Sequence, residues 1–224
     1  MAKDMFLLWG SGSPPCWRVM IALEEKNLQG YQHKLLSFEK GEHKSKEVLD
    51  INPRGQLPAF RHGTNVVNES FAACMYLENQ FKSQGNSLIP SDPAEQALVY
   101  QRSFEALNLH QKMVDLITYT RRTPEEERHE EAVKRNKEGA TAELQIWESH
   151  LQKTGPYLAG KNFSMADVVF FPTLALGFRL GLSQKKYPKL GGYHDLLKNR
   201  PSIKASWPTH WLQNPPTMDP LKDL

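Results

Sequence analysis

Asn52-Pro53-Arg54-Gly55-Gln56-Leu57-Pro58 is the stretch of this 224-residue sequence that decides the fold. The pair Glu69-Ser70 follows it, eleven residues after Pro58, and Ser13-Pro14-Pro15-Cys16 precedes it near the N-terminus. Each motif alone is weak evidence. Taken together, in this order and at these separations, the three motifs are more informative than any one of them.

The segment before this stretch has the pattern of a strand, a helix and a second strand. Residues 5–9 form a short, continuous apolar run, which is typical of a strand buried on both faces. Ser13 suits the N-cap of a helix and Pro14 its first position, and Gly30 ends the helical pattern. Residues 31–38 read as the second strand, so we expect a right-handed crossover.

The segment around and after the deciding stretch completes a small domain. Residues 41–51 are polar and predicted to be partly helical, and two short strands are expected at 58–61 and 65–68. A helix over 70–82 then closes the unit. The order βαβ, β-hairpin, α is the thioredoxin-like arrangement.

The second half of the chain carries helical signals. Residues 84–93 are rich in Ser, Asn and Pro and read as a linker between a first domain at 1–83 and a helical domain at 94–224. Asp92-Pro93-Ala94-Glu95 and Thr123-Pro124-Glu125-Glu126 each combine a capping residue, a proline and a glutamate. We therefore expect long helices over 93–121 and 124–153.

Two further helices are expected near the C-terminus. Ser164-Met165-Ala166-Asp167 has the pattern of a capping box and starts an apolar helix. Pro172 lies inside this helix and should either kink it or remove one backbone hydrogen bond. A last helix is predicted around 202–211, followed by a proline-rich tail.

Composition excludes several classes of protein. The 28 Lys and Arg residues against 25 Asp and Glu are interspersed, so no basic stripe marks a nucleic-acid-binding face. Cys16 and Cys74 are too few and too far apart for a disulfide scaffold or a zinc site, which favours a reducing compartment. The apolar runs at 5–9 and 168–176 are too short for a signal-peptide core and a membrane span, respectively. We expect a soluble, cytoplasmic protein.

The motifs together resemble those of the cytosolic glutathione transferases of the serine type. The likeness spans the whole chain, and the runs at 10–19 and 52–58 are most similar to the rho class, near the theta, delta and zeta classes. It implies an α/β thioredoxin-like N-terminal domain that binds glutathione and an all-α C-terminal domain that lines an electrophile site. It also implies a homodimer.

The activity implied is conjugation of the glutathione thiolate to small hydrophobic electrophiles, in detoxification of xenobiotics. Glutathione is then a co-substrate, and no metal or other cofactor is expected, nor a nucleic-acid or membrane partner. A free cysteine thiol titrates near 8.5, so half-ionisation at pH 7 needs roughly 2 kcal/mol of selective stabilisation of the anion. One hydrogen bond to a charged group contributes about 1.5–3 kcal/mol. By resemblance, the donor is Ser13, with Ser11 as its competitor.

The same resemblance assigns the remaining site residues. For glutathione they are His43, Lys44, Gln56, Leu57, Pro58, Glu69 and Ser70. Leu57 would pair its backbone with the cysteinyl unit at a cis-proline turn, while Glu69 and Ser70 would hold the γ-glutamyl end. The electrophile candidates from the helical half are Met113, Leu116, Tyr119, Phe178 and Trp211.

Three other readings compete with this one. A cysteine at position 13 would indicate thiol–disulfide exchange, but the chain has Ser13 there, and Cys16 reads as a core residue. The run Trp17-Arg18-Val19 is shared with zeta-class isomerases, whose serine motif differs. A non-catalytic interaction module with the same fold is the third.

Overall fold

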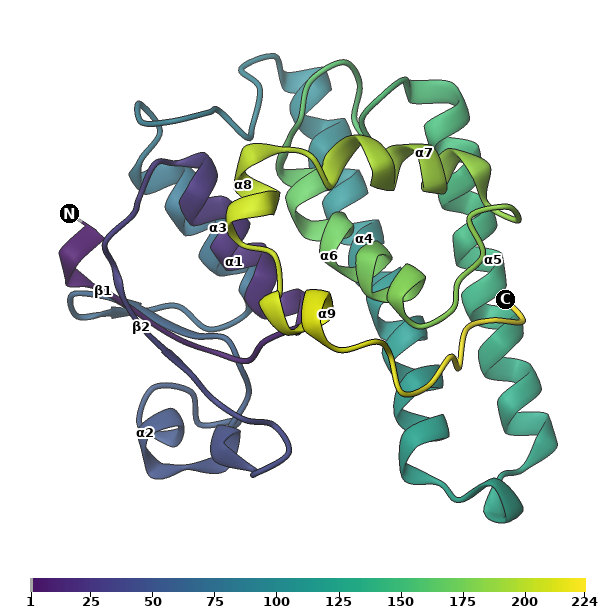
Figure 1. Cartoon of the computed structure of the whole chain (residues 1–224). Helices are drawn as coiled ribbons and strands as arrows, with labels where there is room; N and C mark the ends of the chain where they lie inside the picture. Colours follow the sequence, from purple (N-terminus) through teal and green to yellow (C-terminus); the bar gives the residue numbers. More distant parts are fainter. Residues whose placement is uncertain (1) are drawn as a thin grey trace. The chain divides into compact units, whose positions relative to one another are not determined.

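The computed structural model describes residues 2–224, which divide into two compact units (Figure 1). One unit comprises residues 2–88 together with Arg200–Asn214, and the other comprises Ile89–Asn199 together with Pro215–Leu224. The sequence led us to expect that all residues after 94 would form the helical domain. The structure instead groups Arg200–Asn214 with the N-terminal unit.

A four-stranded mixed sheet forms the centre of the first unit. Its strands are β1 (Met5–Trp9), β2 (Gln32–Leu35), β3 (Ala59–His62) and β4 (Asn65–Val66). They lie in the order β2-β1-β3-β4, with β1 parallel to β2, and with β3 antiparallel to both β1 and β4. Each strand matches a predicted one, although β2 is shorter than the expected 31–38.

Three helices accompany this sheet. They are α1 (Pro14–Glu25), α2 (Lys46–Leu49) and α3 (Ser70–Gln80). Figure 1 shows α1 and α3 on one face of the sheet and α2 on the other. Short 3₁₀ turns occupy Ala2–Asp4 and Glu42–Lys44. The thioredoxin-like arrangement is therefore confirmed.

A buried ion pair joins the ends of α1 and α3. Lys26, directly after α1, lies with its Nζ 2.8 Å from Glu78 Oε2 of α3, and the two side chains are 0% and 3% exposed. Lys26 also donates to the Asn86 carbonyl at 3.0 Å, and Glu78 accepts from the Leu88 backbone N–H at 3.2 Å. The pair thus ties the last residues of α1 and α3 to the chain that leaves the unit.

The C-terminal part of the first unit consists of two short helices. We predicted one helix around 202–211, but the structure has α8 (Pro201–Ala205) and α9 (Thr209–Gln213). Residues 206–208 break the helix, because Pro208 has no backbone N–H to donate and adopts an extended conformation, with φ −63° and ψ 102°.

Buried contacts hold α8 and α9 against α1. Arg200 donates to Glu25 through Nε at 2.5 Å and Nη2 at 2.7 Å, and the Ser202 hydroxyl donates to the same carboxylate. Trp17 Nε1 donates to Ser206 Oγ at 2.9 Å. Burial raises the pKa of Glu25, but the hydrogen bonds from its partners outweigh this and leave the pKa below its ordinary value. These contacts explain why residues 200–214 belong to the first unit.

The second unit is helical. Its main helices are α4 (Pro93–Arg122), α5 (Glu130–Thr154), α6 (Met165–Arg179) and α7 (Pro188–Leu197). Asp92 caps α4 as predicted, accepting from the N–H groups of Ala94 and Glu95 at 2.9 Å each. No prediction had been made for α7. No helix within residues 2–224 is both long and apolar enough to cross a membrane.

The start of α5 differs from the prediction. Residues 125–127 form a 3₁₀ turn, and α5 begins at Glu130, six residues after the predicted start at Pro124. Arg128 is extended, and its guanidinium donates to the carbonyls of Thr120 and Thr123 at 2.7 and 2.9 Å. These bonds satisfy carbonyl groups at the C-terminal end of α4. Because Arg128 is extended in order to make them, residues 124–129 do not form the first turns of α5.

The predicted capping box at Ser164 is confirmed at the start of α6, and the helix continues through Pro172. Asp167 is fully buried and accepts hydrogen bonds from the Ser164 and Leu158 backbone N–H groups at 2.8 and 3.1 Å and from the Tyr193 hydroxyl at 2.9 Å. Burial, which these bonds offset only in part, raises the pKa of Asp167 to about 6.

Asp167 should make the stability of the protein pH-dependent. Because its pKa in the folded state is raised from 3.8 to about 6, the folded state binds the proton more tightly than the unfolded state between those values. Its stabilising contribution should therefore fall as the pH rises from about 4 to about 6, by roughly 3 kcal/mol, and stay constant above. Urea denaturation of the wild type and of Asp167→Asn at several pH values measures this, since the variant lacks the titrating group. A constant difference between the two curves contradicts the assignment.

Candidate functional site

Two of the three sequence motifs meet at one end of the sheet. β1 ends at Trp9, and the loop of residues 10–13 leads from it into α1. β3 begins at Ala59, directly after the Leu57–Pro58 peptide bond, which is cis as the resemblance implied. Leu8 pairs with Ala59, so the end of β1 and the start of β3 lie side by side. Figure 1 shows both reaching this end, near the start of α1.

Ser13 occupies the N-cap position of α1, but its side chain makes no capping hydrogen bond. Its backbone is extended, with φ −80° and ψ 117°, and the residue is half-buried. The hydroxyl instead reaches the thiol of Cys16. Ser13 therefore stands at a helix start without serving as the cap, and the partner of its hydroxyl is the Cys16 thiol.

Cys16 is a core residue, as predicted. It is 1% exposed and packs in an apolar cluster with Leu8, Val48 and Leu57. Burial raises the pKa of its thiol to about 11, against the opposing effect of hydrogen bonds from the Gly10 backbone and the Ser13 hydroxyl. A thiol with this pKa is neutral at pH 7, which agrees with the reading that Cys16 is not a redox residue.

The C-terminal segment supplies residues to the loop of residues 10–13. His210 Nδ1 lies 2.7 Å from Ser11 Oγ, and both side chains are half-buried. A Cβ on Gly12 would lie 2.8 Å from Trp211 Nε1 and 3.1 Å from His210 Cε1, so α9 contacts the loop directly. Trp211 also packs edge-on against Trp17, with ring centroids 5.6 Å apart.

Gly12→Ala should loosen this contact. The φ of Gly12 is +75°, which disfavours any side chain, and the new methyl group would overlap the Trp211 indole. We expect a loss of about 2–3 kcal/mol in the free energy of unfolding, with higher protease sensitivity of residues 206–214. Gly63→Ala is the matched control, since Gly63 has φ +58° but open space at its Cβ position. An equal loss of unfolding free energy in both variants would show that close packing between the loop of residues 10–13 and α9 makes no contribution.

The loop of residues 52–56 is held by an asparagine that the sequence analysis did not single out. Asn52 is 4% exposed, donates to the Gln56 carbonyl at 2.9 Å and accepts from the Arg54 backbone N–H at 3.1 Å. Gln56 itself is exposed, and Leu57 is buried. The Asn52 side chain therefore shapes the turn that presents Gln56 and Leu57 at this end of the sheet.

Glu69 and Ser70 stand at the start of α3. Glu69 is exposed and has φ +69°, a conformation that costs energy in a residue other than glycine and is common at binding sites. Ser70 Oγ accepts a hydrogen bond from Arg18 Nη1 at 3.2 Å. Arg18 is 2% exposed, and although burial lowers its pKa to about 10, it remains charged at pH 7. A buried cation thus lies directly behind the Ser70 hydroxyl.

His43 and Lys44 lie in the 3₁₀ turn before α2. The His43 ring is 5.4 Å from the Phe38 ring, centroid to centroid. Lys44 is exposed, and its Nζ donates to the Arg54 carbonyl at 3.2 Å. Lys44 is therefore connected to the turn of residues 52–56, which belongs to the same unit.

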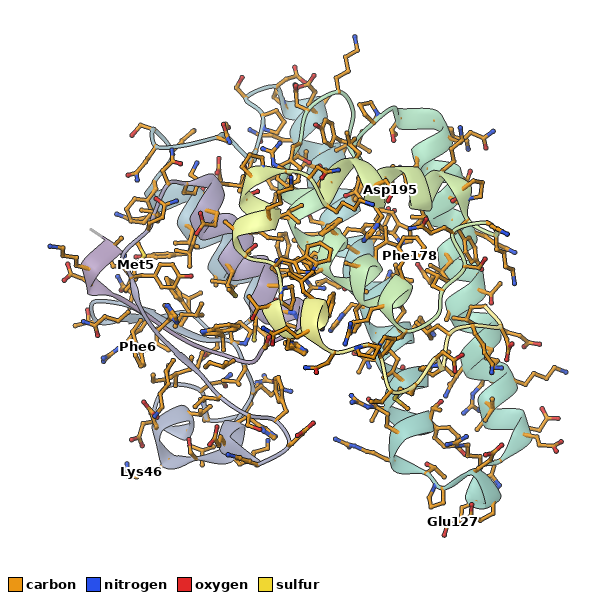
Figure 2. The ribbon with its side chains drawn as sticks, in the orientation of Figure 1. Met5, Phe6, Lys46, Glu127, Phe178 and Asp195 are labelled. Carbon is orange, nitrogen blue, oxygen red and sulfur yellow. The ribbon has the colours of Figure 1, made fainter. Side chains whose placement is uncertain are left out.

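The five electrophile candidates do not form one group within either unit. Met113 and Leu116 of α4 are 1% exposed, and Met113 packs against Gly177 of α6. The Tyr119 hydroxyl accepts from the His129 backbone N–H at 2.9 Å. Phe178, labelled in Figure 2, has its ring 5.0 Å from that of His194. These four belong to the second unit, whereas Trp211 belongs to the first.

Sequence reasoning missed two residues of this site besides Asn52. No local motif marks Arg18, because its place behind Ser70 follows from the packing of α1 on α3. His210 lies 199 residues from Ser11, so no local pattern could connect them. Within residues 2–224, no group of three or more His, Cys, Asp or Glu side chains is arranged to hold a metal ion.

The fold defines a protein of two parts, a thioredoxin-like domain with a mixed four-stranded sheet and a helical domain. The family model "Glutathione S-transferase, N-terminal domain" matches residues 12–80, and the model "Glutathione S-transferase, C-terminal domain" matches residues 107–207. The chain therefore belongs to the glutathione S-transferase family and is an enzyme with that activity.

Individual relatives agree with this assignment. Glutathione S-transferase A of Pleuronectes platessa is 66% identical, and the alignment covers 100% of both chains. The crystal structure of a glutathione S-transferase from the Antarctic clam Laternula elliptica has a TM-score of 0.86 at 42% identity, covering 98% of this chain and 97% of that one. A glutathione transferase homologue from Sulfitobacter, solved with bound glutathione, has a TM-score of 0.77 at 25% identity, covering 91% and 96%.

Proposed function

We propose that this glutathione S-transferase conjugates the glutathione thiolate to small hydrophobic electrophiles, with Ser13 donating the hydrogen bond that stabilises the thiolate. The class that its motifs most resemble is rho. The single observation that carries the proposal is the state of Ser13, whose hydroxyl stands at the start of α1 but makes no capping bond. Rotation about its Cα–Cβ bond would exchange the Cys16 thiol for the sulfur of glutathione as its partner.

The γ-glutamyl end of glutathione would bind at the start of α3. The first N–H groups of a helix attract a carboxylate, and α3 begins at Ser70. Because Ser70 Oγ accepts from Arg18, the Ser70 hydroxyl proton is free to point away from Arg18 and donate to that carboxylate. The exposed Glu69 carboxylate would face the ammonium group.

The other contacts follow the same geometry. Leu57 would pair its backbone with the cysteinyl unit beside Pro58, and Gln56 would reach the glycyl carboxylate together with Lys44 and His43. For the electrophile, the resemblance alone supports the candidates, which are Met113, Leu116, Tyr119, Phe178 and Trp211. We further propose that the enzyme acts as a cytoplasmic homodimer in the detoxification of xenobiotics.

Two measurements test the proposed function. Calorimetry should detect glutathione binding to the full-length protein, and a panel of aryl halides, epoxides, organic peroxides and maleylacetoacetate should separate conjugation from isomerase activity. Conjugation of aryl halides or epoxides that requires glutathione supports the proposal. Turnover of maleylacetoacetate alone, or a complete lack of glutathione binding by folded protein, contradicts it.

A further inference from the structure

The hydrogen bond between Ser11 and His210 is not explained by the proposed role of Ser13. His210 comes from α9, and its Nδ1 is 2.7 Å from Ser11 Oγ, a short distance for a bond between a hydroxyl and an imidazole. Ser11 lies two residues before Ser13 in the same loop. The loop therefore presents two hydroxyls, and only that of Ser11 is hydrogen-bonded to a side chain that can accept a proton near neutral pH.

The His210 ring is held in place by the structure around it. α8 and α9 are fixed to α1 by the buried Glu25–Arg200 ion pair and by the Trp17–Ser206 hydrogen bond. Next to His210, the Trp211 indole packs against Trp17 and leaves no room for a Cβ on Gly12. Proton transfer requires that the donor and acceptor atoms are held in a fixed geometry. The contacts of α8 and α9 with α1 hold the His210 ring in this way.

The two serines of the loop have different partners. The Ser13 hydroxyl reaches the Cys16 thiol, which burial keeps neutral with a pKa of about 11, so this branch offers no proton acceptor. The Ser11 hydroxyl meets an imidazole. His210 contacts Ser11 and Gly12 of the loop and Trp211 of its own helix.

We propose that His210, acting through the Ser11 hydroxyl, receives the proton of the glutathione thiol, while Ser13 donates a hydrogen bond to the resulting thiolate. The inference rests on the proposed function. In the tautomer with its proton on Nε2, His210 Nδ1 accepts from the Ser11 hydroxyl. As the S–H bond breaks, its proton passes to Ser11 Oγ and the Ser11 proton passes to His210 Nδ1, while the bonding electrons stay on sulfur. The products are a thiolate and an imidazolium, so net charge is conserved.

This arrangement has a measurable signature. If His210 keeps the proton, thiolate forms on the enzyme without release of a proton to the solvent. If His210 has no such role, each thiolate formed at a pH above about 7 releases one proton. His210 is a positioning residue in this scheme, because it acts on sulfur only through Ser11.

The test compares two quantities on the full-length enzyme at pH about 7.5, where an unperturbed imidazole is neutral. Ultraviolet absorbance measures the thiolate formed when glutathione binds, and calorimetry in buffers of different ionisation enthalpy measures the protons released. We expect a ratio of released protons to thiolate near zero for the wild type. For His210→Asn, which can keep a hydrogen bond to Ser11 but cannot take a proton, we expect a ratio near one and a roughly tenfold to hundredfold lower kcat/KM for conjugation.

Controls separate this role from a structural one. Ser11→Ala interrupts the path with His210 intact and should give the same ratio as His210→Asn, and the double variant should lose no more activity than either single one. His129→Asn, at the N-cap of α5, changes a histidine elsewhere and should keep the wild-type ratio. A ratio near one in the wild type overturns the relay but leaves the proposed function intact. A lack of thiolate in the wild type refutes the proposed function itself.

Discussion

Ser13→Ala should reduce conjugation roughly 10- to 150-fold at pH 7 while glutathione binding changes by no more than about twofold. The variant loses one hydrogen bond to an anionic sulfur, which contributes about 1.5–3 kcal/mol. The pKa of the bound thiol should rise by about one to two units, which is measured from the ultraviolet absorbance of the thiolate across a pH series. Binding should persist because the contacts proposed for the two ends of the tripeptide come from other residues.

The structure also supplies the controls for this variant. Ser13 makes no capping hydrogen bond, so its replacement by alanine should cost little stability, and a fall in activity cannot be attributed to loss of a helix cap. Ser13→Thr keeps a hydroxyl and should recover much of the activity. Ser183→Ala removes a hydroxyl in the second unit, where it accepts from the Lys186 backbone, and should leave activity unchanged. Full activity of Ser13→Ala would transfer the donor role to Ser11.

Lys26→Met should destabilise the protein by about 3–5 kcal/mol. The substitution keeps the approximate length of the side chain but leaves the Glu78 carboxylate, which is 3% exposed, without its cation. The loss also removes the bond from Lys26 to the Asn86 carbonyl, which anchors the chain as it leaves the first unit. Urea denaturation followed by tryptophan fluorescence measures the change in the free energy of unfolding.

An exposed ion pair provides the comparison. Lys46 of α2, labelled in Figure 2, pairs with Asp50 at 2.7 Å, but the two side chains are 86% and 58% exposed. Lys46→Met should therefore cost no more than about 0.5 kcal/mol. The double variant Lys26→Met/Glu78→Leu should recover much of the lost stability, because it removes the uncompensated charge. If Lys26→Met and Lys46→Met lowered the free energy of unfolding equally, the claim that burial makes the Lys26–Glu78 pair important for stability would be wrong.

The sequence correctly predicted those helices and strands that are determined by residues close to one another along the chain. The apolar run at 5–9, the proline at position 14 and the cap at Asp92 each act within a few residues, and the structure confirms β1, α1 and α4. The signal at Thr123-Pro124 was wrong, because Arg128 bonds back to carbonyls at the end of α4. A sequence pattern cannot show this competition between a helix start and a neighbouring helix end.

The same distinction between local and long-range contacts separates the site residues that the sequence predicted from those that it did not. Motifs located Ser13, Leu57 and Ser70, because the turns that carry them have recognisable sequences. Arg18 and His210 were missed, since each depends on contacts between elements that are distant along the chain. The roles of the predicted site residues, including the electrophile candidates, remain predictions until the variants are measured.

The return of residues 200–214 to the first unit makes that unit discontinuous along the chain. During synthesis, Trp17 and Glu25 leave the ribosome long before Ser206 and Arg200 exist, so the first unit cannot finish folding until nearly the whole polypeptide has been translated. Exchange of whole units between relatives therefore needs three junctions, after residues 88, 199 and 214, since a chimera made with one crossover would set foreign residues against the first helix.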